Sequence, residues 1–539
     1  MTRIITISRL LFLLSLLATF SFLSAWFGDD WVIRFFNNIY QKKQPAEKIK
    51  RKDDKSLKYH KYGFNKDSRN RKKNREQPPV KRKDKFISMP QTAKIINVDI
   101  KDLKGDNNNN TMMIGIIHDL LSASVQLMEV HMNMNSSRIM TKGNNNESSI
   151  SSNVGGTVFG DFCRLSFDVS KEDPTSVPMF RHLVQKSDSC REKRYRVDIK
   201  AFAEFARKHD DNNNREESSS SSSTKVKVLS LGGVIFHQSR CGSTLISNAL
   251  QAMNPASHRV YSEAQPEMVL NFCGDSFQHC SKEVATELFK DVVYIMSRSN
   301  DMKEEKLFYK FHSDSSRNLP VFQEAFPDTP WIFVYRNPIH IIVSQFKEGK
   351  SIAKCVRAKK SPSQQVVDLL LSKKLVSSLS EINTTSPEIF CAATLATYCE
   401  SALRAATKEN SPPSRITRTT FVHYPELPEI LLTEIFPQKF GLSISEKQKE
   451  IIQSISGMYS KASHGRARPY RDDSDLKEKK ATDAIREAVR HLLQKPYEQL
   501  LQASSLSSSS SNIGTIHNKN NYNNMMDDDE SKYHNDSEL

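Results

Sequence analysis

Short apolar runs of strand length alternate with helical stretches between Lys225 and Ala503. The runs expected to be strands are GGVIFH, KLFYKFH, TPWIFVYR and RTTFVHY, and the stretches expected to be helices include STLISNALQAM, LPVFQEAFP, HIIVSQFKEG, IFCAATLATYCESALRAATK and LPEILLTEIF. Strands that alternate with helices form crossover units, so this pattern predicts an α/β fold with a three-layer parallel sheet. Because ligands of such sheets bind beyond the carboxyl ends of the strands, the residues that follow each strand are candidate site residues.

A sharp turn joins the first of these strands to its helix in the stretch FHQSRCGSTLIS, residues 236–247. The residues of the turn are Arg240, Cys241, Gly242, Ser243 and Thr244. Backbone N–H groups and the positive end of the helix converge at such a turn, which favours a phosphate group. Gly242 allows close backbone approach, and Arg240 supplies a fixed charge that can grip two oxygens. A tight turn with a capped helix is the alternative interpretation of this stretch alone.

A second candidate anion site follows in the stretch WIFVYRNPIHIIVSQF. Arg336 leaves an apolar strand, Pro338 opens a helix, and Ser344 lies two turns along that helix. Arg-Asn-Pro by itself is a common junction between a strand and a helix. The functional interpretation therefore depends on the two turns being taken together.

The two stretches together resemble the sulfotransferase family, which has a P-loop-like fold and uses 3′-phosphoadenosine 5′-phosphosulfate (PAPS). The resemblance covers about Lys225 to Ala503, and it implies that the turn from Arg240 to Thr244 holds the 5′-phosphosulfate. It also implies that Arg336 and Ser344 hold the 3′-phosphate, with the separation that the family shows. Cys241 stands where the family usually has serine.

The same resemblance implies two candidates for the base that takes a proton from the acceptor hydroxyl. Glu263, in VYSEAQPE, corresponds in position to the catalytic glutamate of tyrosylprotein-type members. His312, in FYKFHS, is similar to the histidine of the K-x-H element in cytosolic members, and Lys310 then corresponds to the lysine that stabilises the leaving phosphate. An imidazole titrates near neutral pH, whereas a glutamate needs burial to raise its pKa, so both candidates stay open. For Lys310, a solvated lysine at a strand end is the alternative.

We therefore expect an enzyme that moves a sulfuryl group from PAPS to a hydroxyl of a carbohydrate, protein or small-molecule acceptor, without a metal. A P-loop kinase or other NTPase is one alternative, but CGST lacks the lysine that such a loop places before its Ser/Thr. A non-catalytic protein that binds nucleotides or polyanions is the other.

The first 27 residues are expected to be a signal-anchor, with a signal peptide as the alternative. Leu10 to Phe27 is a stretch of eighteen apolar or small residues, a length that suits a bilayer core. A single-pass type II protein in the Golgi lumen is the expected placement, and secretion or another organelle are the alternatives. Most of the net charge of +16 arises between Lys42 and Lys85. We interpret this run as a solvated stalk near the membrane and expect no nucleic-acid partner.

The composition divides the rest of the chain. A disordered, basic and Asn-rich stalk is expected at 28–155, with one amphipathic helix in MMIGIIHDLLSASVQLMEV (112–130). An N-terminal extension of the body follows at 156–208, and a polar linker at 209–224. The sulfotransferase-like domain is expected at 225–503, and a disordered tail at 504–539.

The eight cysteines form no CxxC pairs, so we expect no metal site. Cys163 with Cys190, or Cys273 with Cys280, could form disulfides in an oxidising lumen. Acceptor triplets for N-glycosylation, which fit that compartment, occur at Asn109, Asn135, Asn146 and Asn383.

Overall fold

The computed structural model describes residues 93–99, 111–133, 157–215, 225–271, 280–409, 419–458, 460 and 469–509. All of them lie in one of the chain's two compact units, Lys85–Leu539. The other unit, Met1–Asp84, has no described residue, so the predicted membrane segment at 1–27 lies outside the description. No helix within the described ranges is both long enough and apolar enough to cross a bilayer.

The central element is a five-stranded sheet in which all neighbouring strands are parallel. Its order is β11-β10-β6-β9-β7, with the bounds Ser230–His237 for β6, His258–Ser262 for β7, Lys306–Lys310 for β9, Trp331–Tyr335 for β10 and Thr419–His423 for β11. The predicted α/β class is confirmed. β6, the first of these strands in the chain, lies between β10 and β9. The chain order therefore reverses at β6, and ligands of open α/β sheets bind at such a switch point.

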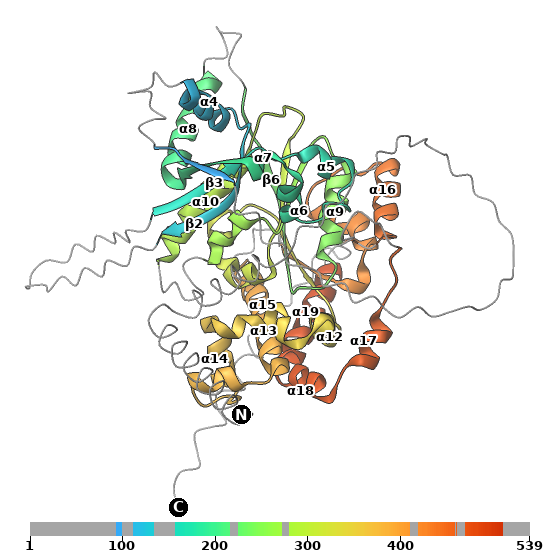
Figure 1. Ribbon diagram of the computed structural model, residues 1–539. Coiled ribbons are helices and arrows are strands. Elements are labelled where there is room, and N and C mark those ends of the chain that lie inside the picture. The colour runs from blue at the N-terminus through green and yellow to red at the C-terminus, as the bar shows by residue number, and fades with distance from the viewer. Residues whose placement is uncertain are drawn as a thin grey trace, which may run out of the picture. The chain divides into compact units, whose positions relative to one another are not determined.

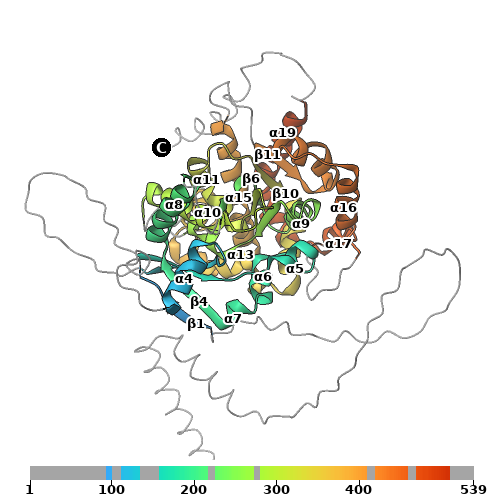
Figure 2. The ribbon, with the colours of Figure 1, turned by 90° about the horizontal axis from the view of Figure 1, so that it is seen from above.

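Helices pack on both faces of this sheet, as the alternation of its side chains requires. One face, which includes Ile235 and Phe308, packs on α9 (Ser243–Met253), η8 (Leu431–Lys439) and α16 (Glu446–Ser456). The other face, which includes Phe236 and Tyr335, packs on α10 (Lys282–Ser297), α11 (Leu319–Ala325), α15 (Pro387–Glu409) and α19 (Gln494–Ser509). Both views of the ribbon show α16 beside α9 (Figures 1 and 2).

A second, four-stranded sheet precedes the parallel one in the chain. Its order is β1-β4-β3-β2, with the bounds Lys94–Asn97 for β1, Gln126–Asn133 for β2, Thr157–Cys163 for β3 and Lys193–Asp198 for β4. The prediction of a stalk over 28–155 is wrong for residues 93–99 and 111–133, which form β1, α4 (Thr111–Leu121) and β2. The single helix expected at 112–130 is also wrong, because a turn at Ala123, with φ at 54°, separates α4 from β2.

Arg298, the residue that follows α10, connects this helix to the N-terminal part. Its guanidinium pairs with Asp210, with Nε at 2.7 Å from Oδ2, and donates to the carbonyls of Leu120 and Leu121 at the end of α4. Burial alone raises the pKa of Asp210, but its bonds to Arg298, His209 and Tyr294 lower that pKa to about 2. This buried ion pair joins α4, α8 (Ile199–Arg215) and the end of α10.

The remaining boundaries differ from the predictions by a few residues. α8 continues to Arg215, into the predicted linker at 209–224, and α19 continues to Ser509, into the predicted tail at 504–539. The helix expected in LPEILLTEIF appears as η8, a π-helix with Pro437 inside it. The other elements are α5 (Phe167–Glu172), α6 (Phe180–Lys186), α7 (Ser189–Glu192), β5 (Lys227–Val228), η1 (Gln265–Asn271), β8 (Arg298–Ser299), η2 (Ser313–Asn318), α12 (Pro338–Gln345), η3 (Phe346–Glu348), η4 (Lys350–Ile352), α13 (Lys354–Arg357), η5 (Ala358–Lys360), α14 (Gln364–Ser372), η6 (Leu379–Thr384), η7 (Tyr424–Glu426), α17 (Ser474–Lys480) and α18 (Asp483–Leu492).

Two disulfides lie within the described residues. Cys163–Cys190, one of the predicted pairs, joins β3 to α7, and Cys355–Cys391, which was not predicted, joins α13 to α15. Cys280 is disulfide-bonded, while Cys273 lies outside the described residues.

Candidate active site

The turn after β6 has an unusual backbone. Ser239, Arg240 and Gly242 have φ values of 86°, 51° and 87°. His237 supports the turn from the end of β6: its Nδ1 accepts a hydrogen bond from the backbone N–H of Ser239 at 3.0 Å, so its Nε2 carries the proton and donates to the carbonyl of Phe311 at 3.0 Å. Arg240 is exposed at the tip, and α9 begins at Ser243.

Gly242 is required at its position for two reasons. Its φ of 87° disfavours residues with a Cβ, and an added Cβ would lie 2.9 Å from side-chain atoms of both Leu427 and Tyr424. The close approach expected of Gly242 is therefore made to the segment that follows β11. Ser243 and Thr244, in the first turn of α9, are buried, and Thr244 Oγ1 has no hydrogen-bond partner among the described residues.

The turn after β10 lies next to the turn after β6, because Val334 is paired with His237 in the sheet. The Cys241 thiol donates to the carbonyl of Val334 at 3.0 Å, and the backbone N–H of Arg336 donates to Gln238 Oε1 at 3.5 Å. The structure thus brings together the two turns that the sequence separates. Ser344 is half-buried on α12, and the next residue, Gln345, donates to Ser239 Oγ at 3.0 Å.

Arg336 is almost fully buried and makes several contacts. Its guanidinium stacks on the ring of Tyr424 at 3.9 Å, and its Nη2 donates to Ser474 Oγ at 2.9 Å and Asp473 Oδ1 at 3.4 Å. Its Nε has no partner in the described part of the chain. Sequence reasoning missed Tyr424, Asp473 and Ser474 as neighbours of this arginine.

Glu263 and Lys310 form an ion pair at the ends of the neighbouring strands β7 and β9. Lys310 Nζ lies 2.5 Å from Glu263 Oε1, and the backbone N–H of Glu263 donates to the carbonyl of Lys310 at 2.7 Å. His237 Nε2 lies 3.8 Å from the same carboxylate. The side chain of Lys310 is 0% exposed, so the interpretation as a solvated lysine is wrong. Glu263 keeps 15% of its side chain exposed.

A carboxylate that was not predicted, Glu267 in η1, lies behind His312. Glu267 Oε1 accepts hydrogen bonds from both the backbone N–H and Nδ1 of His312, the second at 2.8 Å. Burial raises the pKa of Glu267 to about 7; the hydrogen bonds from His312 oppose this shift, and the charge of Glu263 adds to it. Glu267 Oε2 is buried and has no partner among the described residues. The signal in the sequence was an acidic residue inside the apolar run QPEMVL.

Backbone strain is concentrated at this edge of the sheet. Five non-glycine residues of the described chain have positive φ, and three of them, Ser239, Arg240 and Glu263, lie within three residues of the ends of β6 or β7. Residues held in the left-handed region cluster at functional sites, where the surrounding structure maintains them. The strain therefore marks the same place as the candidate residues.

The unpartnered atoms test whether this edge fits an anionic nucleotide. Thr244 Oγ1, Gln238 Nε2 and Arg336 Nε are buried without a hydrogen-bond partner among the described residues, and all three belong to the two adjoining turns. Each of these groups can donate a hydrogen bond. Buried polar groups are normally satisfied, so this concentration of unused donors suits a ligand rich in acceptor oxygens.

One group of side chains in the described structure has the types and spacing of metal ligands, and it lies elsewhere. Ligand atoms of Glu129, His131 and Asp161, on β2 and β3, lie within 4.8 Å of one another. Asp161 is already held by Arg196, with Nε at 2.6 Å from Oδ1 and Nη2 at 2.9 Å from Oδ2. A cation would have to displace this arginine, so the cluster is accounted for as an ion-pair network.

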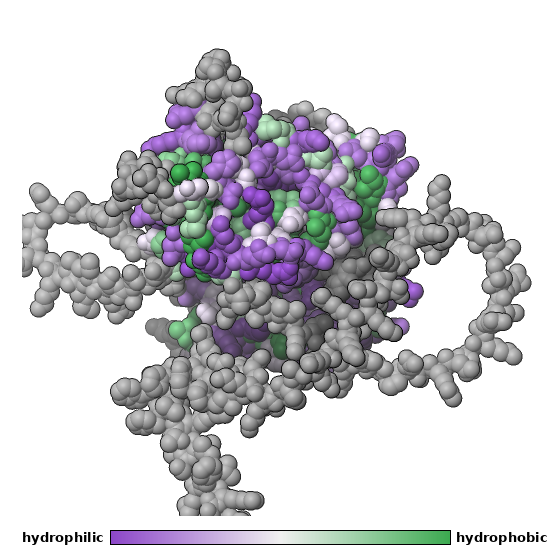
Figure 3. Space-filling model, turned by 45° about the horizontal axis from the view of Figure 1, so that its top comes forward, coloured by the Kyte–Doolittle hydropathy of each residue, from purple (hydrophilic) through white to green (hydrophobic). Residues whose placement is uncertain are grey.

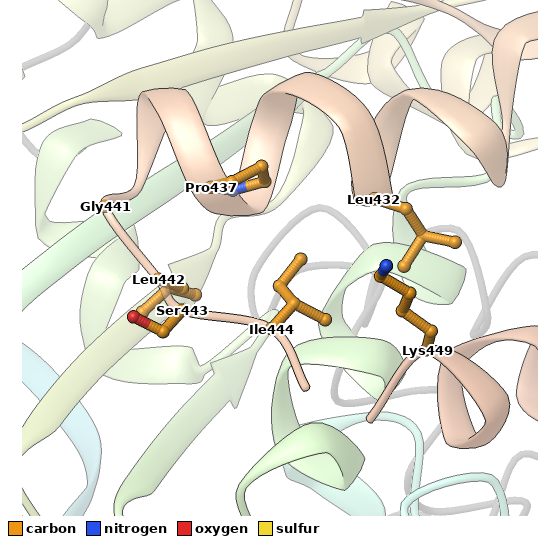
Figure 4. Close-up of a pocket in the computed structure, with 7 residues that line it drawn as sticks. All are labelled: Leu432, Pro437, Gly441, Leu442, Ser443, Ile444 and Lys449. Carbon is orange, nitrogen blue, oxygen red and sulfur yellow. The ribbon is translucent and has the colours of Figure 1, made fainter. Parts of the chain in front are cut away.

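A shallow hollow of about 380 Å³ lies between η8 and α16, apart from the candidate residues. Its lining is Leu432, Pro437, Gly441, Leu442, Ser443, Ile444 and Lys449 (Figure 4). Its one charged group, Lys449, pairs with Glu446 at 2.7 Å. On the face that Figure 3 shows, the described surface is mostly polar, with apolar residues in small separate groups. We therefore place no candidate catalytic residue in this hollow or on this surface.

Comparison of the chain with models of known protein families, and with curated proteins, found no match.

Proposed function

We propose that the protein is a PAPS-dependent sulfotransferase whose active site lies at the carboxyl edge of the five-stranded sheet. The observation that carries the proposal is the contact between the two turns, in which the strained loop at Arg240 adjoins the buried Arg336 across paired strands. Unused buried donors on both turns, together with an imidazole and two carboxylates in the segments that follow β7 and β9, support it.

The residues present fit the two anionic ends of the co-substrate. The turn from Arg240 to Thr244 would hold the 5′-phosphosulfate through backbone N–H groups, hydroxyls and the arginine. Arg336, with Ser344 on the following helix, would hold the 3′-phosphate. Asp473, which now contacts Arg336 at 3.4 Å, would have to move aside.

In the proposed reaction, a bond forms between the sulfur and the acceptor hydroxyl oxygen while the bond between sulfur and the phosphate oxygen breaks. The hydroxyl proton passes to a base on the protein, and 3′,5′-ADP leaves with the electron pair of the broken bond. Charge spreads over the sulfuryl oxygens, so alignment and cationic groups supply most of the acceleration.

Of the two candidate bases, the geometry favours His312. The carboxylate of Glu263 is held by the buried ammonium of Lys310 at 2.5 Å, which lowers its ability to accept a proton. His312 uses Nδ1 to contact Glu267, and its ring is 18% exposed. Nε2, on the other side of the ring, is thus the atom available to an acceptor hydroxyl.

Thermal-shift and calorimetric binding experiments test the proposal. We expect 3′,5′-ADP without metal to raise Tm, and ATP with Mg²⁺ to have a smaller effect. We expect Arg336→Ala and Arg240→Ala to weaken binding of 3′,5′-ADP at least 100-fold and about 10-fold, respectively, because Arg336 is buried and Arg240 is exposed. Stabilisation by ATP with Mg²⁺ alone would favour a kinase or NTPase, and binding without turnover of labelled PAPS would favour a non-catalytic protein.

The disulfides support a proposed location in an oxidising compartment. Cys163–Cys190 and Cys355–Cys391 both lie within the folded unit, and such bonds persist in lumenal and extracellular proteins. The Golgi lumen remains the proposed placement, with attachment through residues 1–27. Protease protection of the full-length chain in sealed microsomes would test it.

A further inference from the structure

We infer that Glu267 is the positioning residue for His312: it fixes the ring so that Nε2 faces the acceptor, and its carboxylate stabilises the imidazolium that forms when the proton is taken up. This inference rests on the proposed function, because it assigns a role within the same site. Glu267 itself contacts neither the acceptor nor the nucleotide in this scheme, and it acts only through the histidine.

The contacts of Glu267 determine which ring nitrogen of His312 is available. One carboxylate oxygen, Oε1, accepts from the backbone N–H and from Nδ1 of the same residue. These two bonds hold both the backbone and the ring of His312, so rotation about its side-chain bonds is restricted. Because Nδ1 carries a proton toward Glu267, Nε2 of the neutral ring has the free electron pair.

The surroundings of Glu267 make its charge effective. Its side chain is 0% exposed, so water does not screen its interaction with the imidazole. Titratable groups near the pair among the described residues include Glu263, Lys310, Tyr309, Asp314 and Lys354. Lys310 is neutralised by Glu263, and Lys354 pairs with Asp314 at 2.8 Å. Tyr309, also buried, has no hydrogen-bond partner for its hydroxyl among the described residues.

The unpartnered oxygen Oε2 distinguishes Glu267 from a carboxylate that only supports the fold. A buried carboxylate with one oxygen unsatisfied is costly, unless a proton or a neighbouring positive charge compensates it. Uptake of the acceptor proton at Nε2 makes His312 positive and supplies that charge. The free energy of the His312–Glu267 pair is therefore higher before proton transfer than after it. This difference lowers the barrier for a base that accepts a proton.

The test compares Glu267→Gln with the wild-type chain and with a matched control, Glu487→Gln. Glutamine keeps the size and one acceptor oxygen but removes the charge. Glu487 makes the same kind of bond to His491, at 2.6 Å on the exposed surface of α18. The measurements are transfer from labelled PAPS as a function of pH, affinity for 3′,5′-ADP, and the rate of carbethoxylation of His312 by diethylpyrocarbonate, read by peptide mass spectrometry.

We expect E267Q to lower kcat about 10- to 100-fold and to move the acid limb of the pH–rate profile to lower pH. Affinity for 3′,5′-ADP should stay within twofold, and E487Q should behave as the wild type. In a His312→Ala background, E267Q should cause no further loss, because Glu267 acts through the histidine. Carbethoxylation of His312 near pH 7.5, where the carboxyl of Glu267 is mostly ionised, should be faster in E267Q, because the imidazole loses the negatively charged partner that holds its ring.

A loss of kcat without any movement of the acid limb, or an additional loss in the His312→Ala background, would overturn the inference and assign Glu267 a purely structural role. Equal carbethoxylation rates in the wild type and E267Q would overturn it without any reference to activity. If the wild type neither binds 3′,5′-ADP nor turns over PAPS, the proposed function fails, and the carbethoxylation rates still decide whether the pair exists.

Discussion

Two pairs of histidine and carboxylate, one on the N-terminal sheet and one beyond the carboxyl edge of the parallel sheet, differ in how many of their hydrogen-bonding atoms have partners. On the N-terminal sheet, His131 contacts Asp161 at 3.0 Å, and Arg196 engages both oxygens of the same carboxylate. Beyond the carboxyl edge of the parallel sheet, His312 contacts Glu267 at 2.8 Å, and the second oxygen of Glu267 has no partner in the described structure. The first arrangement is complete without any ligand. In the second arrangement, one carboxylate oxygen can still accept a hydrogen bond, which is a property expected of a reactive site.

The pKa values of Asp161 and Glu267 differ in the same way as their contacts. Burial alone raises the pKa of Asp161, but hydrogen bonds from His131 and Arg196 lower it to about 2. Burial of Glu267 raises its pKa to about 7, because the bonds from His312 are not sufficient to offset it. The two carboxyls therefore differ in whether their hydrogen-bonding and charged partners outweigh the effect of burial on the pKa.

The largest expected effect concerns the ion pair of Glu263 with Lys310 at the edge of the parallel sheet. Glu263→Gln leaves the ammonium of Lys310 buried without a countercharge, and we expect a loss of about 3–5 kcal/mol in the free energy of unfolding. The double variant with Lys310→Met removes both charges and should recover most of that loss. Urea denaturation measures both values; equal stability of the single variant and the wild type would contradict the buried pair.

The next effect compares the two histidine partners directly. Asp161→Asn removes the countercharge of Arg196, and we expect it to lower the free energy of unfolding by about 3 kcal/mol at pH 7.5. Glu267→Gln should cost far less at this pH, because it removes a carboxylate that is incompletely satisfied. If the two variants lost equal stability in urea denaturation, the distinction between the two sites would be wrong.

The pH dependence of stability should have opposite signs at the two sites. The contribution of Asp161, with a folded pKa of about 2 against 3.8, is present above about pH 4 and is lost as the pH falls through 2. The contribution of Glu267, with a folded pKa of about 7 against 4.5, is present below pH 4.5 and is lost as the pH rises through 7. Between pH 4.5 and 8, the free energy of unfolding of the wild type, measured by thermal unfolding, should therefore fall by about 3 kcal/mol relative to that of Glu267→Gln. A constant difference across this range would contradict the raised pKa.

The smallest expected effect concerns the acidic residue on Arg336. Asp473 competes with a phosphate for Nη2, so Asp473→Asn should tighten binding of 3′,5′-ADP two- to fivefold, about 0.5–1 kcal/mol. Asp475→Asn, an exposed acid on the same helix, makes the same change in net charge and is the control. If both variants tightened binding equally in calorimetry, the effect would come from net charge and not from the contact with Arg336.

The parallel sheet was largely predictable because its strands are apolar runs with clear ends. β6, β9, β10 and β11 coincide with predicted runs, and both turns follow from them. β7 was missed because His258 and Arg259 look like loop residues in the sequence. In the structure, His258 Nδ1 bonds to the carbonyl of Leu250 at 2.7 Å, and Arg259 is buried against Glu304. Hydrogen bonds and ion pairs to residues outside the strand thus satisfy its polar side chains and allow it to be buried.

The N-terminal sheet was not predictable for a related reason. Its strands, such as KIIN and QLMEVHMN, are short or charged, and they lie between Asn-rich segments that indicate disorder. The ion pairs that make their polar face stable, such as Asp161 with Arg196, join residues from separate strands. In the candidate site, the residues at the strand ends were predicted, and the acidic residue in the apolar run QPEMVL was the one signal for Glu267. Asp473 was missed because its position depends on how a later segment returns to the edge. No local pattern encodes that return.

A crystal structure of the protein with 3′,5′-ADP tests most directly whether the carboxyl edge is a nucleotide site. We expect the 5′-phosphate at the turn from Arg240 to Thr244 and the 3′-phosphate on Arg336, with Asp473 displaced from the guanidinium. A ligand bound elsewhere, or Arg336 still held by Asp473 and Ser474 in the presence of saturating 3′,5′-ADP, would contradict the assignment.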